Sequence, residues 1–280
     1  MLNSVILSYI TFVYFCSFML YLMMMVMRKS LLGRLATLIT TAGLAVHTVA
    51  LGLRWVESYR LAIGHAPLSN LYESLIFFAW AIVLLYIIME RRTGNKSVGA
   101  FATALAFLAM AYASYSPSIS SQIQPLIPAL QSNWLIAHVI TCFFGYAAFA
   151  LAFGLSLMYL LKRLDRPERS NGFLGLIPRA AILDDLSYQM VVIGFLLLTL
   201  GIITGAVWAH AAWGSYWTWD PKETWSLITW LVYAAFLHSR LIRGWRGKKL
   251  ALFSIVGFSC VLFTYFGVNY LAGLHSYAQS

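Results

Sequence analysis

The stretch Trp213-Gly-Ser-Tyr-Trp217-Thr-Trp219-Asp220-Pro-Lys-Glu-Thr-Trp225 separates two long apolar runs of the chain. It holds four of the ten tryptophans within thirteen residues, mixed with glycine, proline and two acidic residues. Because indole rings favour the boundary between a membrane and water, the stretch and its apolar flanks predict a loop at a membrane surface. An aromatic belt spreads its rings over many helix ends, whereas these rings gather in one loop whose proline restricts the backbone. This Trp-rich stretch therefore predicts a platform for a large flat ligand.

The rest of the chain is apolar enough to cross a membrane several times. Its 280 residues are 61% hydrophobic and 10% charged, with a mean hydropathy of +0.78, which excludes a water-soluble domain. An apolar run of about 20 residues crosses a hydrocarbon core of about 30 Å. The pattern predicts an all-α polytopic membrane protein, one transmembrane domain over 1–280 that places its Trp-rich loop near 208–225. About eight helices are expected, near residues 4–27, 33–53, 71–89, 97–115, 134–161, 188–209, 225–242 and 249–270.

The positive charge follows the predicted topology. The formal net charge is +10, and 16 of the 19 lysines and arginines lie in the loops after the first, third, fifth and seventh apolar runs. The positive-inside rule places those loops on the cytoplasmic or stromal side. Both termini and the Trp-rich stretch are then expected on the outer side. The basic excess is thus a topology signal, and no nucleic-acid partner is predicted.

Four of the six histidines fall on the predicted outer side. His138 lies about one turn into the outer end of the fifth apolar run, and His275 lies just beyond the eighth. Two histidines at the same membrane surface as an aromatic platform suit a bis-imidazole haem site, because haem iron takes axial histidine. A neutral histidine hydrogen-bonded inside a helix bundle is the alternative for each. For His65 and His210, a structural role in the outer loops is the favoured interpretation.

His47 and His238 lie within predicted spans, where an ionisable residue is a functional candidate because its desolvation is costly. His47 lies 13 residues beyond Arg34, about 20 Å from the inner end of its helix. His238 lies two residues before Arg240, near the inner boundary. Different depths argue against a shared iron, so a second ligand for His238 is expected from another helix or another chain. For His47, a hydrogen-bonded neutral histidine is the favoured interpretation.

The few charged residues outside the basic loops have two interpretations each. Three basic residues on the outer side are candidates to pair with haem propionates, or simply reach the interface by snorkelling: Arg54, Arg60 and Lys222. Asp220 before Pro221 fits a helix N-cap, and Glu223 three residues later fits a capping box, with a catalytic carboxylate role as the alternative. Asp184-Asp185 predicts the N-terminus of the sixth helix.

The Trp-rich stretch resembles the tryptophan-rich "WWD" motif of the haem-handling protein family. Other stretches resemble its cytochrome c-type biogenesis branch, CcsA (ResC), and the resemblance spans roughly residues 50–280: Pro67-Leu-Ser-Asn-Leu-Tyr-Glu-Ser74, Pro128-Ala-Leu-Gln-Ser-Asn-Trp-Leu-Ile-Ala-His138, Leu237-His-Ser-Arg240 and Phe266-Gly-Val-Asn-Tyr-Leu-Ala-Gly-Leu-His275-Ser. The "WWD" stretch alone fits the related CcmC and CcmF proteins equally well. The Ser-Asn-Leu-Tyr-Glu stretch and the eight-span layout favour the CcsA branch.

The resemblance implies a role in cytochrome c biogenesis. His138 and His275 match two outer histidines that ligate haem b, and His238 matches an intramembrane histidine whose partner comes from the companion subunit CcsB (ResB). The haem-binding residues around the "WWD" motif would be Trp213, Trp217, Trp219, Asp220 and Trp225. The resemblance implies a component of a cytochrome c synthetase (haem lyase) complex, which attaches haem to the CxxCH motif of apocytochrome c. The bacterial cytoplasmic membrane or the thylakoid membrane is the expected location, with the site on the periplasmic or lumenal side.

Three alternatives differ in class. The first is a haem exporter or chaperone of the CcmC or CcmF type. The second is a membrane electron-transfer protein with permanent haem, but His47 and His238 do not align for stacked bis-histidine sites. The third is a secondary transporter, which predicts internal symmetry or a broken helix near the midplane, and the sequence shows neither.

Overall fold

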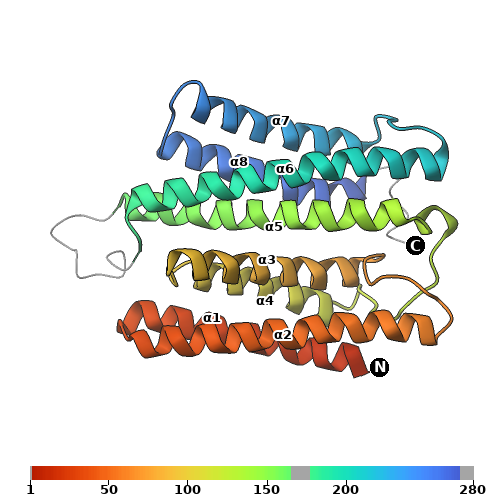
Figure 1. Cartoon of the computed structure of the whole chain (residues 1–280), viewed down its shortest axis with the longest axis horizontal. Helices are drawn as coiled ribbons and strands as arrows, with labels where there is room; N and C mark the ends of the chain where they lie inside the picture. Colours follow the sequence, from red (N-terminus) through yellow and green to blue (C-terminus); the bar gives the residue numbers. More distant parts are fainter. Residues whose placement is uncertain (1, 165–176, 272–280) are drawn as a thin grey trace. The chain divides into compact units, whose positions relative to one another are not determined.

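The described part of the computed structural model, residues 2–164 and 177–271, is all-helical and contains no strand. The described residues form eight α-helices, which Figure 1 labels, and the 3-10 helices η1 (Pro128–Leu130) and η4 (Gly267–Tyr270). The α-helices are α1 (Leu2–Met27), α2 (Ser30–Arg60), α3 (Leu71–Thr93), α4 (Gly99–Tyr115), α5 (Asn133–Lys162), α6 (Ala180–Trp213), α7 (Pro221–Leu241) and α8 (Lys248–Tyr265). The predicted all-α class is confirmed.

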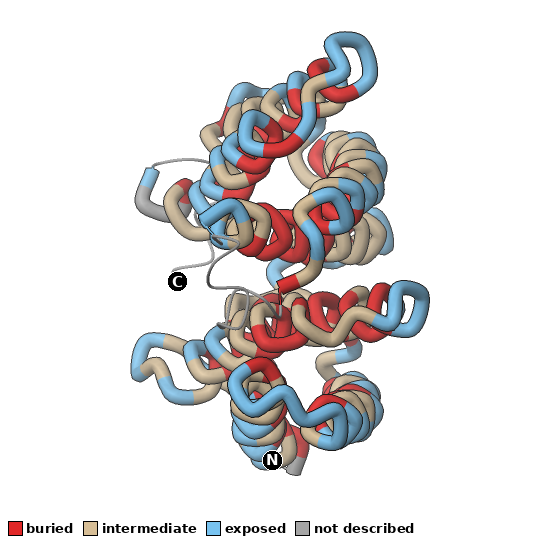
Figure 2. The backbone as a smooth tube through the Cα atoms, turned by 90° about the vertical axis from the view of Figure 1, so that its left-hand side faces the viewer, coloured by how far each residue is buried: buried red, intermediate tan, exposed pale blue. Residues whose placement is uncertain are grey.

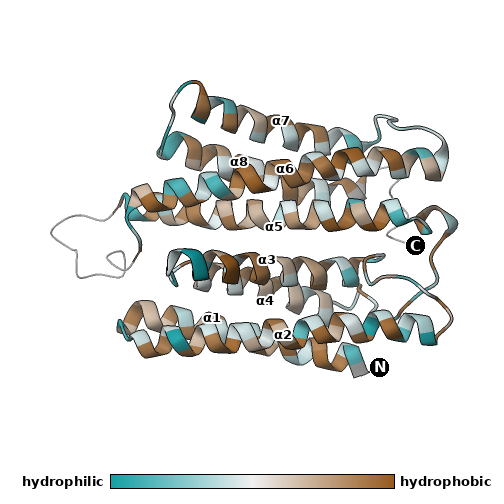
Figure 3. Ribbon diagram, viewed as in Figure 1, coloured by the Kyte–Doolittle hydropathy of each residue, from teal (hydrophilic) through white to brown (hydrophobic). Residues whose placement is uncertain are grey.

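Most of these helices are suited to a membrane. Six of them are long and apolar enough to cross one, namely α1, α2, α3, α5, α6 and α8. Helix α4 is apolar but has 17 residues, and α7 has 21 residues with polar groups at both ends. Figure 3 shows apolar residues along the helices and hydrophilic residues concentrated towards their ends and connections. The protein is therefore a polytopic membrane protein, while the side on which each terminus lies stays a prediction.

Several helices run further than the apolar runs predicted. Helix α2 extends to Arg60, and α6 extends at both ends, from Ala180 to Trp213. Hydropathy marks where the apolar residues stop, but a helix continues until a residue ends it. Gly214 ends α6 with a φ of 80°, a left-handed conformation that favours glycine. Part of the predicted 208–225 loop is thus helical, and the connection between α6 and α7 is 214–220.

The described helices form two compact units. Unit 1 contains α1–α4 and unit 2 contains α5–α8, with the chain passing from one to the other at Leu126 and Ile127. The Trp-rich stretch, His138 and His238 all belong to unit 2. The single transmembrane domain over residues 1–280 stays a prediction.

Unit 1 is held by interlocking large and small side chains. Helix α1 buries a residue every three or four positions, among them Tyr14 and Tyr21, and leaves its other faces exposed. The facing side of α2 buries small residues such as Gly43, which contacts Val13 and Tyr14. Close approach of small and large residues is how helices associate where water supplies no driving force. Figure 2 shows the resulting division of each helix into buried and exposed sides.

Unit 2 is centred on a close contact between α5 and α6. Gly145 of α5 faces backbone atoms of Gly194 and Leu198, at 3.2 Å from where its Cβ would lie. Gly201 and Gly205 of α6 provide room for Cys142 and His138 of α5. Because these glycines lack side chains, the two helices approach closely, and α5 residues pack directly on the backbone of α6.

Candidate functional site

His138 lies in the second turn of α5, and its imidazole is held by the backbone of α6. Its Nδ1 lies 2.7 Å from the carbonyl oxygen of Gly201. A carbonyl only accepts, so Nδ1 donates its hydrogen, and in the neutral ring Nε2 then carries the lone pair. Metal-ligating histidines are commonly held in this way, with one ring nitrogen donating to a backbone carbonyl. Nε2 of His138 is therefore the ring nitrogen that carries the lone pair, as a metal-ligating nitrogen must.

Trp208 connects His138 to the Trp-rich stretch. The two rings are stacked, with centroids 6.0 Å apart and an interplanar angle of 16°. The Trp208 Nε1 donates to the carbonyl of Ala129 at 2.8 Å, and its ring meets Trp213 edge-to-face at 4.9 Å. Sequence reasoning did not name Trp208 as a site residue. Its position in the same helix, five residues before Trp213, is a signal that could have identified it.

The connection 214–220 presents two further indole rings. Trp217 and Trp219 meet edge-to-face, with centroids 5.6 Å apart and an interplanar angle of 88°. Trp219 has a φ of 60°, a left-handed conformation that is rare for a bulky residue, and the residue is 68% exposed. Such a backbone conformation costs about 1–3 kcal/mol and persists only where neighbours enforce it. The conformation of the 214–220 connection therefore keeps Trp219 exposed.

Asp220 and Glu223 hold that connection in place. Asp220 is the N-cap of α7, and its Oδ1 accepts from the Lys222 N–H at 2.9 Å, which confirms the predicted cap. Glu223 does not complete the expected capping box with Asp220. Its Oε2 instead accepts from the backbone N–H of Thr218 at 2.7 Å and from its hydroxyl at 3.2 Å. Both carboxylates therefore have structural partners.

Trp225 joins the end of the stretch to α8. Its ring packs on Phe263 at 4.2 Å, and its carbonyl accepts from the hydroxyls of Thr229 and Thr264. The structure thus brings together His138, Trp208 and Trp213 through ring contacts, and Trp217 with Trp219. His275, the other predicted outer ligand, lies outside the described residues.

His238 is far from this group of residues. It lies in the last turn of α7 and is exposed, 17 residues beyond Pro221, or about 25 Å along the helix axis. It therefore lies near the end of unit 2 that is opposite the Trp-rich stretch.

His47, His65 and His210 contact other groups of the protein. The Nδ1 of His47 lies 3.0 Å from the hydroxyl of Tyr14 in the interior of unit 1. The ring nitrogens of His65 lie 2.8 Å from the carbonyl of Ala66 and 3.0 Å from that of Gln124. His210 is exposed and stacks on Tyr216 at 4.2 Å. These contacts support the structural interpretations.

The prediction that Arg54 pairs with haem propionates is wrong, and so is the alternative that it snorkels to the interface. It is fully buried, and its Nε donates to Glu73 at 2.9 Å in an ion pair. Its charge is already balanced inside unit 1. Of the other two candidates, Arg60 is exposed and Lys222 is half-buried in the first turn of α7.

Asp184 and Asp185 do not mark the start of α6. The helix begins at Ala180, and both carboxylates lie about one turn inside it. Arg240 of α7 donates to Asp184 at 2.5 Å and to Asp185 at 2.7 Å. Their role is to pair with a basic residue of another helix.

Comparison with known proteins identifies the family. Residues 68–275 match the family described as "Cytochrome C assembly protein", which covers more than half of the chain. The chain belongs to the cytochrome c assembly protein family. The match includes the whole Trp-rich stretch and all of α5–α8. The protein is thus an integral membrane protein of cytochrome c biogenesis.

Relatives within the cytochrome c assembly family confirm the predicted branch. The chain is 45% identical over 271 residues to "Cytochrome c biogenesis protein CcsA" of Synechococcus sp. (strain CC9902), covering 88% of this chain and 86% of the relative. The CcsA protein of Pyropia yezoensis is 41% identical over 284 residues, with 88% of each chain covered.

A solved structure, also of a protein named for cytochrome c, has the same fold. "Cytochrome c Heme Lyase CcmF" superposes with a TM-score of 0.70 at 17% identity, covering 94% of this chain. The chain spans about half the length of that protein, since 46% of it is covered. At this identity the likeness establishes the fold alone.

Proposed function

We propose that this protein binds haem at the Trp-rich end of unit 2 and presents it to apocytochrome c for covalent attachment. The observation that carries the proposal is His138, whose Nδ1 is fixed on the Gly201 carbonyl and whose ring stacks on Trp208. An imidazole held in one tautomer beside a series of indole rings suits an iron porphyrin, which needs an axial nitrogen and flat apolar contacts. Haem is the substrate that is handed on.

The residues present fit such a ligand. His138 and His275 would supply the axial nitrogens for haem b. The indole faces of Trp213, Trp217, Trp219 and Trp225 would contact the macrocycle, and Asp220 would complete this set of haem-binding residues. Two polar atoms there, Nε1 of Trp217 and Oε1 of Glu223, are buried without a hydrogen-bond partner in the described structure. A polar ligand group at this site would satisfy them.

The protein's contribution to the reaction is binding and orientation. The haem vinyl groups and the reduced thiols of the CxxCH motif supply the thioether chemistry. His138, held by the Gly201 carbonyl and the Trp208 ring, would bind the iron and so orient the plane of the macrocycle. The indole rings exclude water from one face and leave the attachment edge accessible. The incoming CxxCH histidine would take the place of one outer ligand.

His238 fits a separate, earlier role in the same function. Its place at the opposite end of α7 excludes it from the iron bound by His138. It would receive haem on the inner side, with a second ligand from the companion subunit CcsB (ResB). The site of attachment would lie on the periplasmic or lumenal side of a bacterial cytoplasmic or thylakoid membrane. In this arrangement the chain is one component of a cytochrome c synthetase.

Replacing His138 tests the proposal. The His138→Ala variant is expected to lose c-type cytochromes almost completely, and added imidazole should partly restore them by filling the vacant coordination position. The purified parent protein should show a bis-imidazole haem spectrum that the variant lacks. His210→Ala is the matched control, because it removes an exposed imidazole near the same stretch and should leave maturation intact. Normal maturation in His138→Ala, or an equal loss in His210→Ala, would contradict the proposal.

A further inference from the structure

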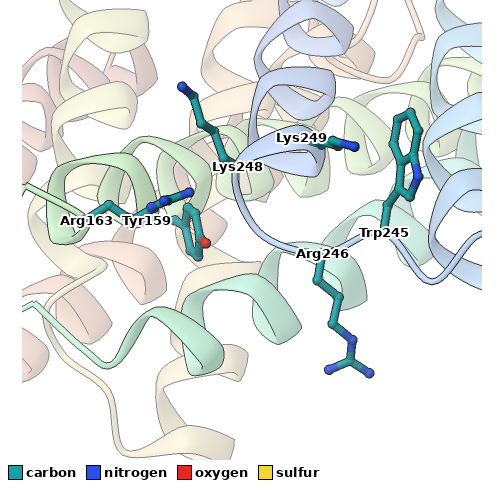
Figure 4. A pocket seen from close by; sticks show the side chains of 6 residues that line it. All are labelled: Tyr159, Arg163, Trp245, Arg246, Lys248 and Lys249. Carbon is teal, nitrogen blue, oxygen red and sulfur yellow. The ribbon is translucent and has the colours of Figure 1, made fainter.

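A basic cavity lies at the end of unit 2 opposite the Trp-rich stretch. Its volume is about 440 Å³, and its lining comes from the end of α5, the α7–α8 connection and the start of α8: Tyr159, Arg163, Trp245, Arg246, Lys248 and Lys249. Figure 4 shows Tyr159 and Arg163 on one side, and Trp245 and Lys249 on the other. None of these residues is part of the proposed haem site.

The connection that forms one wall of the cavity has a defined conformation. Gly244 and Gly247 have φ angles of 63° and 71°, in the left-handed region. The backbone N–H of Trp245 donates to the carbonyl of Ser239 at 3.0 Å, and that of Gly247 donates to Asp184 at 2.8 Å. Tyr159 lies directly against Gly247, where a larger residue would collide with its hydroxyl. The backbone of the connection and of the start of α8 therefore sets where Arg246, Lys248 and Lys249 lie at the cavity.

The cavity carries a concentrated positive charge. Within residues 2–164 and 177–271, none of its four basic side chains forms an ion pair. The nearby carboxylates of Asp184 and Asp185 are already bound to Arg240. Lys249 lies 4.6 Å above the ring of Trp245, a cation–π contact that orients the ammonium group without neutralising it. The site therefore favours an anionic ligand.

The position of the cavity indicates what kind of anion it receives. Helix α5 ends at Lys162 and α8 begins at Lys248, and both are candidate membrane spans. Their ends lie at the level of lipid headgroups. Large apolar side chains that lie close in sequence to the lining residues are strongly exposed, including Leu164 at 70%, Leu241 at 66% and Ile242 at 74%. Acyl chains could cover these side chains while the basic residues bind the headgroup.

We propose that this cavity binds the phosphate headgroup of an anionic phospholipid. Basic pockets between transmembrane helices are suited to such headgroups. The guanidinium groups of Arg163 and Arg246 can each donate two hydrogen bonds to phosphate oxygens, and the lysines add point charges. The lipid connects the end of α5 to the α7–α8 connection, and so stabilises the end of unit 2 that carries His238. The assignment does not depend on the haem site proposed at the Trp-rich stretch.

Native mass spectrometry of the full chain in a non-ionic detergent tests the proposal, with phosphatidylglycerol and phosphatidylcholine as probes. The parent protein should retain phosphatidylglycerol preferentially. Arg246→Gln/Lys249→Gln should weaken that binding about tenfold, because each basic residue contributes to attraction of an anionic headgroup. Arg91→Gln/Arg92→Gln is the matched control, since it removes two exposed charges from the end of α3 and should change binding less than about twofold. Equal retention in parent and cavity variant, or equal loss in both variants, would overturn the assignment.

A second measurement does not depend on the charge variants. Brominated phosphatidylglycerol should quench part of the tryptophan fluorescence of the parent, and Trp245→Phe should remove that part. Quenching that is unchanged in Trp245→Phe would overturn the assignment.

Competition separates a phospholipid from other anions. Metal-free protoporphyrin IX supplies carboxylates, and inorganic phosphate supplies the same phosphate chemistry without acyl chains. Neither should displace phosphatidylglycerol at equal concentration. Displacement by either probe, with binding of that probe lost in Arg246→Gln/Lys249→Gln, would show a site for a porphyrin carboxylate or for free phosphate and overturn the lipid assignment.

Discussion

At the scale of single residues, His138 shows how an ordinary side chain becomes a candidate ligand. The identity of the residue supplies an imidazole, but the Gly201 carbonyl decides which nitrogen carries the hydrogen. Gly205 makes this contact possible, because a Cβ there would lie 2.6 Å from Nδ1 of His138. A candidate ligand on α5 therefore depends on two residues of α6 that have no side chain.

Gly205→Ala is expected to disturb His138 without unfolding the protein. The added methyl must displace the imidazole, and overpacking of this kind costs about 1–3 kcal/mol. Haem content and the bis-imidazole spectrum of the purified protein should fall strongly, together with c-type cytochromes. Gly52→Ala in α2 is the control, because nothing lies within 4 Å of its added Cβ. A normal haem spectrum in Gly205→Ala would show that the position of His138 does not matter.

At the scale of elements, buried polar contacts join helix ends that are distant in sequence. The Ser-Asn-Leu-Tyr-Glu motif forms the start of α3, where the Asn70 side chain accepts from Glu73 N–H at 2.8 Å and Glu73 accepts from Ser69 N–H at 2.9 Å. Glu73 also pairs with Arg54 of α2, which donates in turn to Asn3 of α1 and to the carbonyl of Ser121. One motif thus caps a helix and connects three helices and a loop of unit 1.

Removing one partner of the Arg54–Glu73 ion pair should destabilise the protein more than replacing both partners with neutral residues. Arg54→Gln leaves the buried Glu73 carboxylate without its cation, which is expected to cost about 3–5 kcal/mol in the free energy of unfolding. Arg54→Gln/Glu73→Gln removes both charges and should recover part of that loss. Arg60→Gln, at the exposed end of the same helix, should change stability by less than about 0.5 kcal/mol. Denaturation in mixed micelles measures all three, and a double variant no better than Arg54→Gln would argue against the ion pair.

At the scale of the whole molecule, charge and hydropathy together define a topology. Within residues 2–164 and 177–271, six helices are long and apolar enough to span a membrane. Helices α4 and α7 complete the predicted eight, and α7 connects the Trp-rich stretch at one end to the basic cavity at the other. If every helix crosses, the candidate haem site and the cavity lie on opposite sides of the membrane.

Reporter fusions test that topology. A reporter joined after Arg169 and one joined at Ser280 should report opposite sides, with the C-terminus and the Trp-rich stretch outside. The reason is the confinement of 16 of the 19 basic residues to alternate connections. The prediction places three crossings, α6, α7 and α8, between the two fusion points. If both reporters are on the same side, the number of crossings between them is even and the predicted topology is wrong.

The sequence by itself determined the features that depend on near neighbours. Apolar runs placed all eight helices, Pro221 and Asp220 marked the start of α7, and the motifs identified the cytochrome c assembly family. Only the tertiary structure decided the partners of buried polar groups. Glu73 pairs with a residue 19 positions away, Asp184 with one 56 positions away, and His138 with a carbonyl 63 positions away. Helix formation and capping act within a turn or two, whereas a buried charge or imidazole is satisfied by whichever group packing brings beside it.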